Sequence, residues 1–375
     1  MKIKKKISLI LVVFLIGGLG GVFFDRVVFP YLNSSNWFSR YEFLRKSSDE
    51  VTVINKTEQV FVKEETSINK IASRASSSVV NILSYSENAL KENLKNGTGV
   101  IATSDGIIIT YSTAINLDNS KYKIFLSDGA SYDAQLIGID SFSGLVFLRI
   151  QAQNLPVISF GNSDDTKPGE KIVAIGNNTS YFSNRFASGL LSAIRFDYSL
   201  SGKSVSLAEK LEGVFGSDFA NQKNYVGGPI VDYTGQVIGI TGSLEKNNQI
   251  EYFQIPSNKI RGVLDRMIKN ELDKAPTLGI YYIPLTPQYA MSHNMAGKNG
   301  ALIYSPSGQQ GLAIIAGSPA QKAGLQIKDI ITKIGNQEIN LNNPLPDLLI
   351  KYKKGEIAEI TIQRAEKEMV LKVQL

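Results

Sequence analysis

The sequence predicts a mainly β protein with two folded parts behind an apolar N-terminal segment. Short apolar runs such as GVIATSDGIIIT, GLVFLRI and GQVIGITG follow one another in the middle of the chain, and Gly, Asp, Asn or Ser bounds them. Closely spaced short strands with turn residues between them are typical of a barrel or a sandwich and not of alternating strands and helices. The chain has 375 residues and is 43% hydrophobic, which is enough for two domains with their own cores.

The amino-acid composition excludes several classes of site. There is no cysteine, which excludes disulfides, thiolate metal sites and cysteine nucleophiles. His293 is the single histidine, so a multi-histidine metal site is excluded too, and we expect neither a metal nor a cofactor. The net charge is +6, but Lys2, Lys4, Lys5 and Lys6 supply much of it, and the nearly balanced remainder argues against nucleic-acid binding.

The N-terminal segment predicts a membrane anchor. The run from Ile7 to Phe24 has no charged residue and is at the short end of the roughly 17–25 residues that span a bilayer. A cleavable signal peptide is the competing interpretation, but the run continues into GGVFFDRVVF without a small-x-small cleavage site. A buried core helix would not explain the MKIKKK head. We therefore expect a single-pass protein of the cell membrane, with the lysines in the cytoplasm and the folded parts outside it.

Composition divides the chain into four segments. Residues 1–30 are the basic head and the anchor, and residues 31–63 are a polar stalk rich in Ser, Asn, Lys and Glu. Residues 64–272 contain the short strands of the first folded part. Residues 276–375, which begin within the linker-like stretch APTLG, form the second, α+β part.

A short helix is expected within SINKIASRASSSVVNIL, at the start of the first folded part, and three further helices follow it. The first of these three begins after Pro256, and its apolar residues recur at helical spacing: Ile260, Val263, Leu264 and Ile268. In GSPAQKAGL, Ser318 can cap a helix, Pro319 suits its first position and Gly324 suits a left-handed stop. The range Pro346–Tyr352 predicts a short amphipathic helix.

A series of motifs resembles one protease family throughout both parts. GTGVIATSDGIIIT, ASGLLSAI, GGPIVDYTGQVIGI, FQIPSNKI and AGSPAQKAGLQIKDIITKIGN are similar, in this order, to segments of the high-temperature-requirement (HtrA, Do-like) serine proteases. The resemblance covers roughly residues 64–375. It implies a chymotrypsin-like double β-barrel joined to a C-terminal PDZ domain, with C-terminal peptides or unfolded exported proteins as partners and a homotrimer as the assembly.

The three catalytic positions of the family hold other residues in this chain. The family's histidine follows the strand that corresponds to GIIIT, and YSTAI places Thr113 there. The family's aspartate opens the strand that corresponds to SGLVFLRI, which gives Gly144. The nucleophile precedes Gly-Gly-Pro, and NYVGGP gives Val226. Asn224 also replaces a glycine whose N–H group would face the oxyanion.

These replacements predict a barrel without serine-protease chemistry. Valine has no nucleophilic atom, threonine is no base near neutral pH, and glycine orients nothing. Losing the whole triad costs a comparable protease a factor of about 2 × 10⁶ in kcat. The main hypothesis is therefore a membrane-anchored pseudoprotease that senses or scaffolds exported proteins.

The alternative hypothesis is an active serine-type endopeptidase that uses another constellation. A Ser-Lys dyad could pair Lys223 with Ser112 or Ser217, although a lysine at that place is usually a solvated charge. His293 lies outside the barrel segment, and we expect it at a surface or a helix end.

The peptide-binding groove is expected at the start of the second part. In the family an apolar-Gly-apolar turn presents backbone N–H groups to a peptide carboxylate, and TLGIYY supplies Leu278, Gly279 and Ile280. The peptide would add as a strand beside Ile280–Ile283, with the helix at Pro346–Tyr352 as the opposite wall. The simpler interpretation is that LGI only begins a strand.

Overall fold

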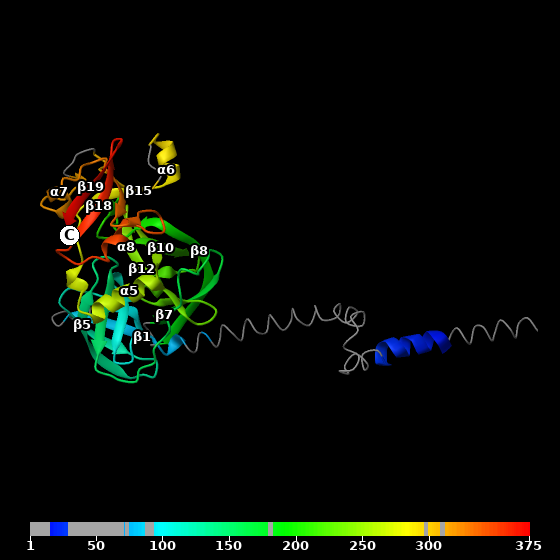
Figure 1. Cartoon of the computed structure of the whole chain (residues 1–375). Helices are drawn as coiled ribbons and strands as arrows, with labels where there is room; N and C mark the ends of the chain where they lie inside the picture. The colour runs from blue at the N-terminus through cyan, green and yellow to red at the C-terminus, as the bar shows by residue number, and fades with distance from the viewer. Residues whose placement is uncertain are drawn as a thin grey trace, which may run out of the picture. The chain divides into compact units, whose positions relative to one another are not determined.

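The computed structural model describes residues 16–28, 71, 75–86, 94–178, 183–295, 299–307 and 312–375. The chain divides into two units, Met1–Ile68 and Asn69–Leu375. In the first unit, residues 16–23 are α-helical and continue into η1 (Phe24–Val28), drawn in blue in Figure 1. Within the described residues, no helix combines the length and the apolar character that a membrane span needs. The first part of the expected anchor, residues 7–15, and the whole expected stalk, residues 31–63, lie outside the described residues.

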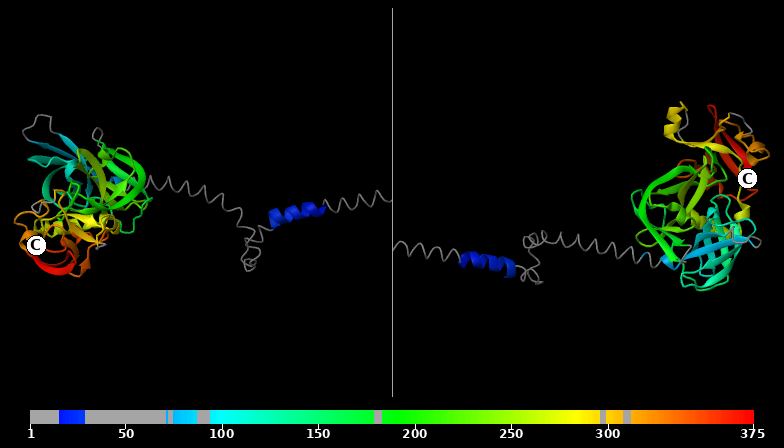
Figure 2. Two further views of the ribbon diagram at one scale, coloured as in Figure 1. Left: turned by 90° about the horizontal axis from the view of Figure 1, so that it is seen from above. Right: turned by 180° about the vertical axis from the view of Figure 1, so that it is seen from behind.

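The second unit contains two closed antiparallel barrels, drawn from cyan to yellow-green in Figures 1 and 2. The first barrel has the order β1 (Val79–Ser86), β2 (Lys95–Ile101), β3 (Ile107–Tyr111), β6 (Leu145–Ile150), β5 (Ser131–Ile139) and β4 (Ser120–Phe125). The second has the order β10 (Glu212–Ser217), β13 (Gln249–Pro256), β12 (Val237–Lys246), β11 (Pro229–Val231), β7 (Lys171–Asn178) and β8 (Ser183–Ser199). The double barrel predicted from the sequence is confirmed.

A separate antiparallel sheet follows in the C-terminal part of the chain. Its order is β19 (Lys367–Gln374), β18 (Ile357–Arg364), β16 (Ile330–Ile334), β15 (Gly300–Ile303), β14 (Tyr281–Leu285) and β9 (Ser206–Leu207), and β17 (Gln337–Glu338) pairs with β16. Strand β9 comes from the connection between β8 and β10 of the second barrel. One strand of this sheet therefore belongs in sequence to the barrel segment, which the sequence analysis did not predict.

The described helices of the second unit are short. Besides the helical residues 71, 75 and 76, they are η2 (Ser112–Ala114), η3 (Gln222–Tyr225), α5 (Ser257–Ile268), η4 (Leu272–Lys274), α6 (Pro287–Ser292), α7 (Pro319–Lys322) and α8 (Leu345–Leu349). The three further predicted helices are confirmed as α5, α7 and α8. In α7 the Ser318 hydroxyl accepts the Gln321 N–H group, and Gly324 follows with φ +78°. One detail of the prediction for α5 is wrong, because Ile268 does not lie on the apolar face of the helix and is 55% exposed. The buried apolar positions recur at 260, 263 and 267, so Met267 is buried in its place.

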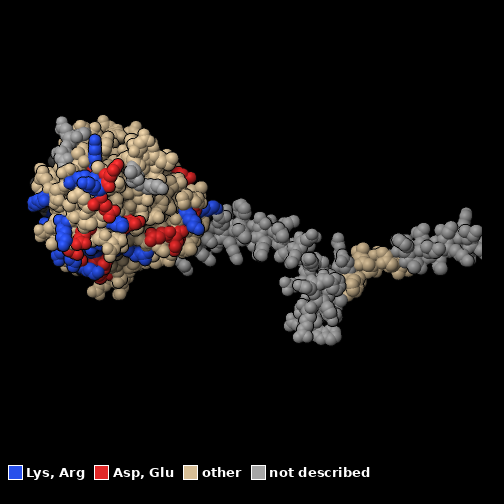
Figure 3. Space-filling model, turned by 45° about the horizontal axis from the view of Figure 1, so that its top comes forward, with Lys and Arg blue, Asp and Glu red and all other residues tan. Residues whose placement is uncertain are grey.

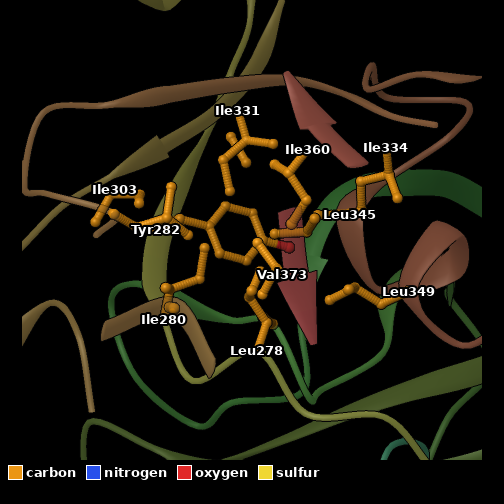
Figure 4. Close-up of a cluster of buried hydrophobic side chains, with 14 of the residues drawn as sticks. Leu278, Ile280, Tyr282, Ile303, Ile331, Ile334, Leu345, Leu349, Ile360 and Val373 are labelled. Carbon is orange, nitrogen blue, oxygen red and sulfur yellow. The ribbon is translucent and has the colours of Figure 1, made fainter. Parts of the chain in front are cut away.

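The core of the C-terminal part gathers around Tyr282, whose side chain is fully buried (Figure 4). Side chains from several strands and from α8 surround it, among them Leu278, Ile280, Ile303, Ile331, Ile334, Leu345, Leu349, Ile360 and Val373. Ala208, which follows β9, belongs to the same cluster and is fully buried. On the molecular face that Figure 3 shows, basic and acidic side chains are interspersed.

Candidate functional site

A pocket of about 490 Å³ lies between the two barrels. The first barrel and its η2 turn contribute Asn81, Lys95, Asn96, Gly97, Thr98, Thr113 and Ala114. The second contributes Asn177, Arg185, Lys223, Asn224, Val226, Ser243, Leu244, Glu245, Ile250 and Tyr252. The structure thus brings Thr113 and Val226 to one pocket, but Gly144 is not among the described residues that line it.

Thr113, which the family resemblance predicts at the histidine position, is exposed and lies on the η2 turn directly after β3. Its Oγ1 lies 2.7 Å from Oγ of Ser243, and 3.4 Å from the Ser243 carbonyl oxygen, which accepts a hydrogen bond from it. Two hydroxyl groups therefore meet where the family would place a base. Neither of them can take up a proton near neutral pH.

The space beside Gly144 is filled by an aromatic ring. Gly144 has φ +79°, and a Cβ atom on it would lie 2.9 Å from the Tyr111 hydroxyl and 3.1 Å from two ring carbons. Tyr111 is buried and packs edge-on against Phe253, with 5.7 Å between ring centroids. Burial raises the pKa of Tyr111. The Tyr111 ring therefore leaves no room for a side chain at Gly144 without a shift.

Val226 follows η3 and is half-buried, and it packs against the hydrophobic cluster that the two barrels share and against that of the first barrel. An oxyanion site would need the N–H groups of residues 224 and 226 to point at the substrate. The Asn224 N–H group instead donates to the Asn221 carbonyl oxygen at 2.9 Å. One of the two donors is therefore engaged inside the turn.

The remaining catalytic candidates are not assembled. The described lining of the pocket includes Lys223 but neither Ser112 nor Ser217, so the structure does not bring the expected dyad together there. His293 caps the end of α6, where its ring stacks on Tyr289 with 4.0 Å between centroids. It lies at a helix end, as expected.

A carboxylate receptor lies at the start of the C-terminal part. The N–H groups of Leu278 and Gly279 both donate to Oε1 of Glu209, at 2.6 and 2.7 Å. The Leu278 and Ile280 side chains are fully buried, so this loop presents only its backbone. Gly279 has φ +78°, and a Cβ atom there would lie 2.3 Å from Cβ of Ser318, which only glycine avoids.

The edge of β14 beside this loop pairs with a strand of the chain itself. Strand β9 runs antiparallel to β14, with Leu207 opposite Tyr281 and Ser206 opposite Tyr282. The Ala208 N–H group donates to the Ile280 carbonyl oxygen at 3.1 Å. The position expected for a peptide is therefore taken by Ser206–Glu209. Sequence reasoning missed this, because only tertiary structure sets a pairing between segments this far apart.

Charged residues tie this strand to the barrel and to α8. The Ser206 hydroxyl donates to the carboxylate of Glu212, which is buried. Burial raises the pKa of Glu212 to about 7, although the Ser206 hydrogen bond and the Lys259 ammonium act in the opposite direction. Lys259 on α5 donates to the Glu212 carbonyl oxygen, and it forms a 2.8 Å ion pair with Asp347 on α8.

Comparisons with known proteins identify the class. Residues 97–240 match the family model described as "Trypsin-like peptidase domain", and residues 276–375 match the one described as "PDZ domain". The chain is 30% identical over 288 residues to a "probable periplasmic serine endoprotease DegP-like" of Chlamydia pneumoniae, covering 72% of this chain and 56% of the relative. It is 26% identical over 283 residues to the protein of that name from Rhizobium meliloti, covering 74% of this chain and 53% of the relative.

Solved structures show the same fold. Two structures of the "HtrA-type protease AlgW", one with a decapeptide and one with a tripeptide, align with TM-scores of 0.61 and 0.64 at 23% identity. Each alignment covers 81% of this chain, with 96% and 95% of the other chain.

This chain therefore has a trypsin-like peptidase domain followed by a PDZ domain, and it is homologous to the HtrA/DegP-like proteases, which confirms the resemblance seen in the sequence. It spans about half the length of these two relatives. Their names alone favour an active serine-type endopeptidase over a non-catalytic protein.

Proposed function

We propose that this chain is a pseudoprotease that binds peptide C-termini in its PDZ groove. The observation that carries the proposal is the convergence of the Leu278 and Gly279 N–H groups on one carboxylate oxygen. Hydrogen bonds to a charged oxygen are among the stronger ones in proteins. Edge-strand pairing beside β14 supplies the remaining backbone contacts.

The inter-barrel pocket supports the non-catalytic part of the proposal. Val226 offers no nucleophile, and the hydroxyl pair of Thr113 and Ser243 offers no base. The Tyr111 ring occupies the space beside Gly144 that an orienting carboxylate would need. A chain that had lost only one catalytic group would still keep room for the others.

The proposal extends to location and assembly. We infer export across the cytoplasmic membrane, with the N-terminal segment as the anchor, from the lysine head and the charge-free run, and from relatives named periplasmic. The homotrimer rests on the family resemblance alone. Membrane fractionation with alkaline extraction tests the anchor, and light scattering of the purified chain tests the trimer.

Three measurements on the purified full chain test the function. Unfolded casein should remain uncleaved, and a fluorophosphonate probe should label no serine. A peptide with a free C-terminus should bind, whereas its amidated counterpart should bind far more weakly, because the amide lacks the negative charge that the loop receives. Equal affinity for the two peptides would contradict the proposed recognition of a terminal carboxylate in the PDZ groove.

An endopeptidase with another constellation is the second candidate. The hydroxyl groups of Thr113 and Ser243 share the pocket with Lys95, and burial lowers the pKa of that lysine. A lysine with a lowered pKa is a suitable base for activating a hydroxyl. Probe labelling that Ser243→Ala or Lys95→Met abolishes would favour this candidate. A lack of labelling in the wild-type chain would exclude it.

A further inference from the structure

We propose that Ser206–Glu209 is an internal ligand that closes the PDZ groove, and that an external peptide competes with it. The structure assigns the competitor's chemistry as a free carboxylate that follows a small apolar last residue. This inference rests on the proposed peptide-binding function, and it adds that the groove is occupied until the internal segment leaves.

The carboxylate of Glu209 takes the place of a peptide's terminal carboxylate. It accepts both loop N–H groups, from Leu278 and Gly279, at 2.6 and 2.7 Å. The residue before it, Ala208, donates its N–H group to the Ile280 carbonyl oxygen at 3.1 Å, as the last residue of an added strand would. An internal segment has no chain end, so a glutamate side chain supplies the charge.

The side chain of Ala208 defines the size of the last-residue pocket. It is fully buried in the cluster that contains Leu278, Ile280, Leu345 and Leu349. Figure 4 shows these four side chains around the Tyr282 ring. Because packed cores resist added volume, a peptide that ends in alanine should fit better than one that ends in phenylalanine.

Further contacts hold the start of the segment and the residues just before it. Before β9, the Lys203 ammonium donates to the Tyr281 hydroxyl at 3.0 Å and lies 4.5 Å from the centre of that ring. Within β9, Ser206 donates to the carboxylate of Glu212, the first residue of β10. The segment is therefore anchored on both the sheet and the barrel.

Competition follows from this geometry. A tethered segment is present at a high effective concentration, so an external peptide binds only the fraction of molecules whose groove is open. Weakening the internal ligand should raise that fraction and lower the apparent Kd of the peptide.

The experiment uses the full chain and a labelled peptide that copies the segment up to its buried alanine, KSVSLA, as free acid and as amide. Anisotropy titrations compare the wild type, Glu209→Ala, Glu209→Gln and the matched control Glu366→Gln. Glu366 is exposed and lies in the turn between β18 and β19. We expect Glu209→Ala to bind the free acid about tenfold or more tightly than the wild type, and Glu209→Gln to lie between them. The control should match the wild type.

Amide hydrogen exchange gives an independent measurement. The N–H groups of Leu278 and Gly279 should exchange faster in Glu209→Ala and recover protection when the free acid binds. Equal Kd values and equal exchange in wild type and both Glu209 variants would overturn the internal ligand. If the variants exchange faster but bind acid and amide alike, the internal ligand stands and the proposed peptide function fails. Tighter binding of a KSVSLF free acid would overturn the small pocket.

Discussion

Replacing Glu212 by glutamine should change how stability depends on pH. Glu212 is 1% exposed, and burial raises its pKa from 4.5 to about 7, with Ser206, Tyr282, Lys259 and Asp347 as the neighbouring polar and charged groups. Between these two values the folded state binds more protons at this site than the unfolded state. The free energy of unfolding contributed by Glu212 therefore falls as pH rises.

The magnitude follows from the two pKa values. From pH 5 to pH 8 the wild type should lose about 2–3 kcal/mol of unfolding free energy relative to Glu212→Gln, which has no proton to release. Urea unfolding followed by far-UV circular dichroism at pH 5, 6.5 and 8 measures the difference. Glu366→Gln, at an exposed glutamate, is the control and should follow the wild type at every pH. A wild-type minus Glu212→Gln difference that stays constant or grows with pH would refute the reasoning.

Three further outcomes are expected. Val226→Ser alone should give no casein cleavage and no probe labelling, because a hydroxyl without a base is not activated; labelling would reveal another base. Gly144→Asp should lower the free energy of unfolding by about 2–5 kcal/mol, from the left-handed backbone and the clash with Tyr111. In a double-mutant cycle, adding Tyr111→Ala should relieve the clash and restore part of the lost unfolding free energy. Strictly additive effects of the two substitutions would contradict this account. Lys259→Met should cost about 1–2 kcal/mol in urea unfolding, because it breaks a partly buried ion pair with α8, whereas Lys372→Met, at an exposed pair, should cost almost nothing.

The sequence predicted the elements whose signals are local. The helix at Pro319–Lys322 follows from its capping serine and its terminal glycine, and both lie within a few residues of it. Gly227, directly after Val226, is needed for close packing. A Cβ atom on Gly227 would lie 2.3 Å from the carbonyl oxygen of Thr98 on the first barrel. The close approach of the two barrels at this point therefore needs a glycine whether or not the chain is catalytic.

The contacts that define the sites could not be predicted in the same way. The resemblance predicted a missing carboxylate at Gly144, but nothing near it in the sequence indicated that Tyr111 would fill the space. Glu209 carries no local sequence signal of its contacts, because its partners at Leu278 and Gly279 lie 69 and 70 residues later. Pairings of this kind depend on how whole segments pack, which local propensity and periodicity do not encode.

Strand β9 changes where the chain can be divided for study. A fragment of residues 276–375 follows the domain boundary predicted from the sequence. It would, however, lack Ser206–Leu207 and leave the backbone of β14 unpaired along one edge. An unpaired edge strand recruits other strands, so such a fragment is prone to self-association and accepts extended peptides without competition. Affinities measured on it would describe an open groove, and they would overstate how readily the intact chain captures a partner.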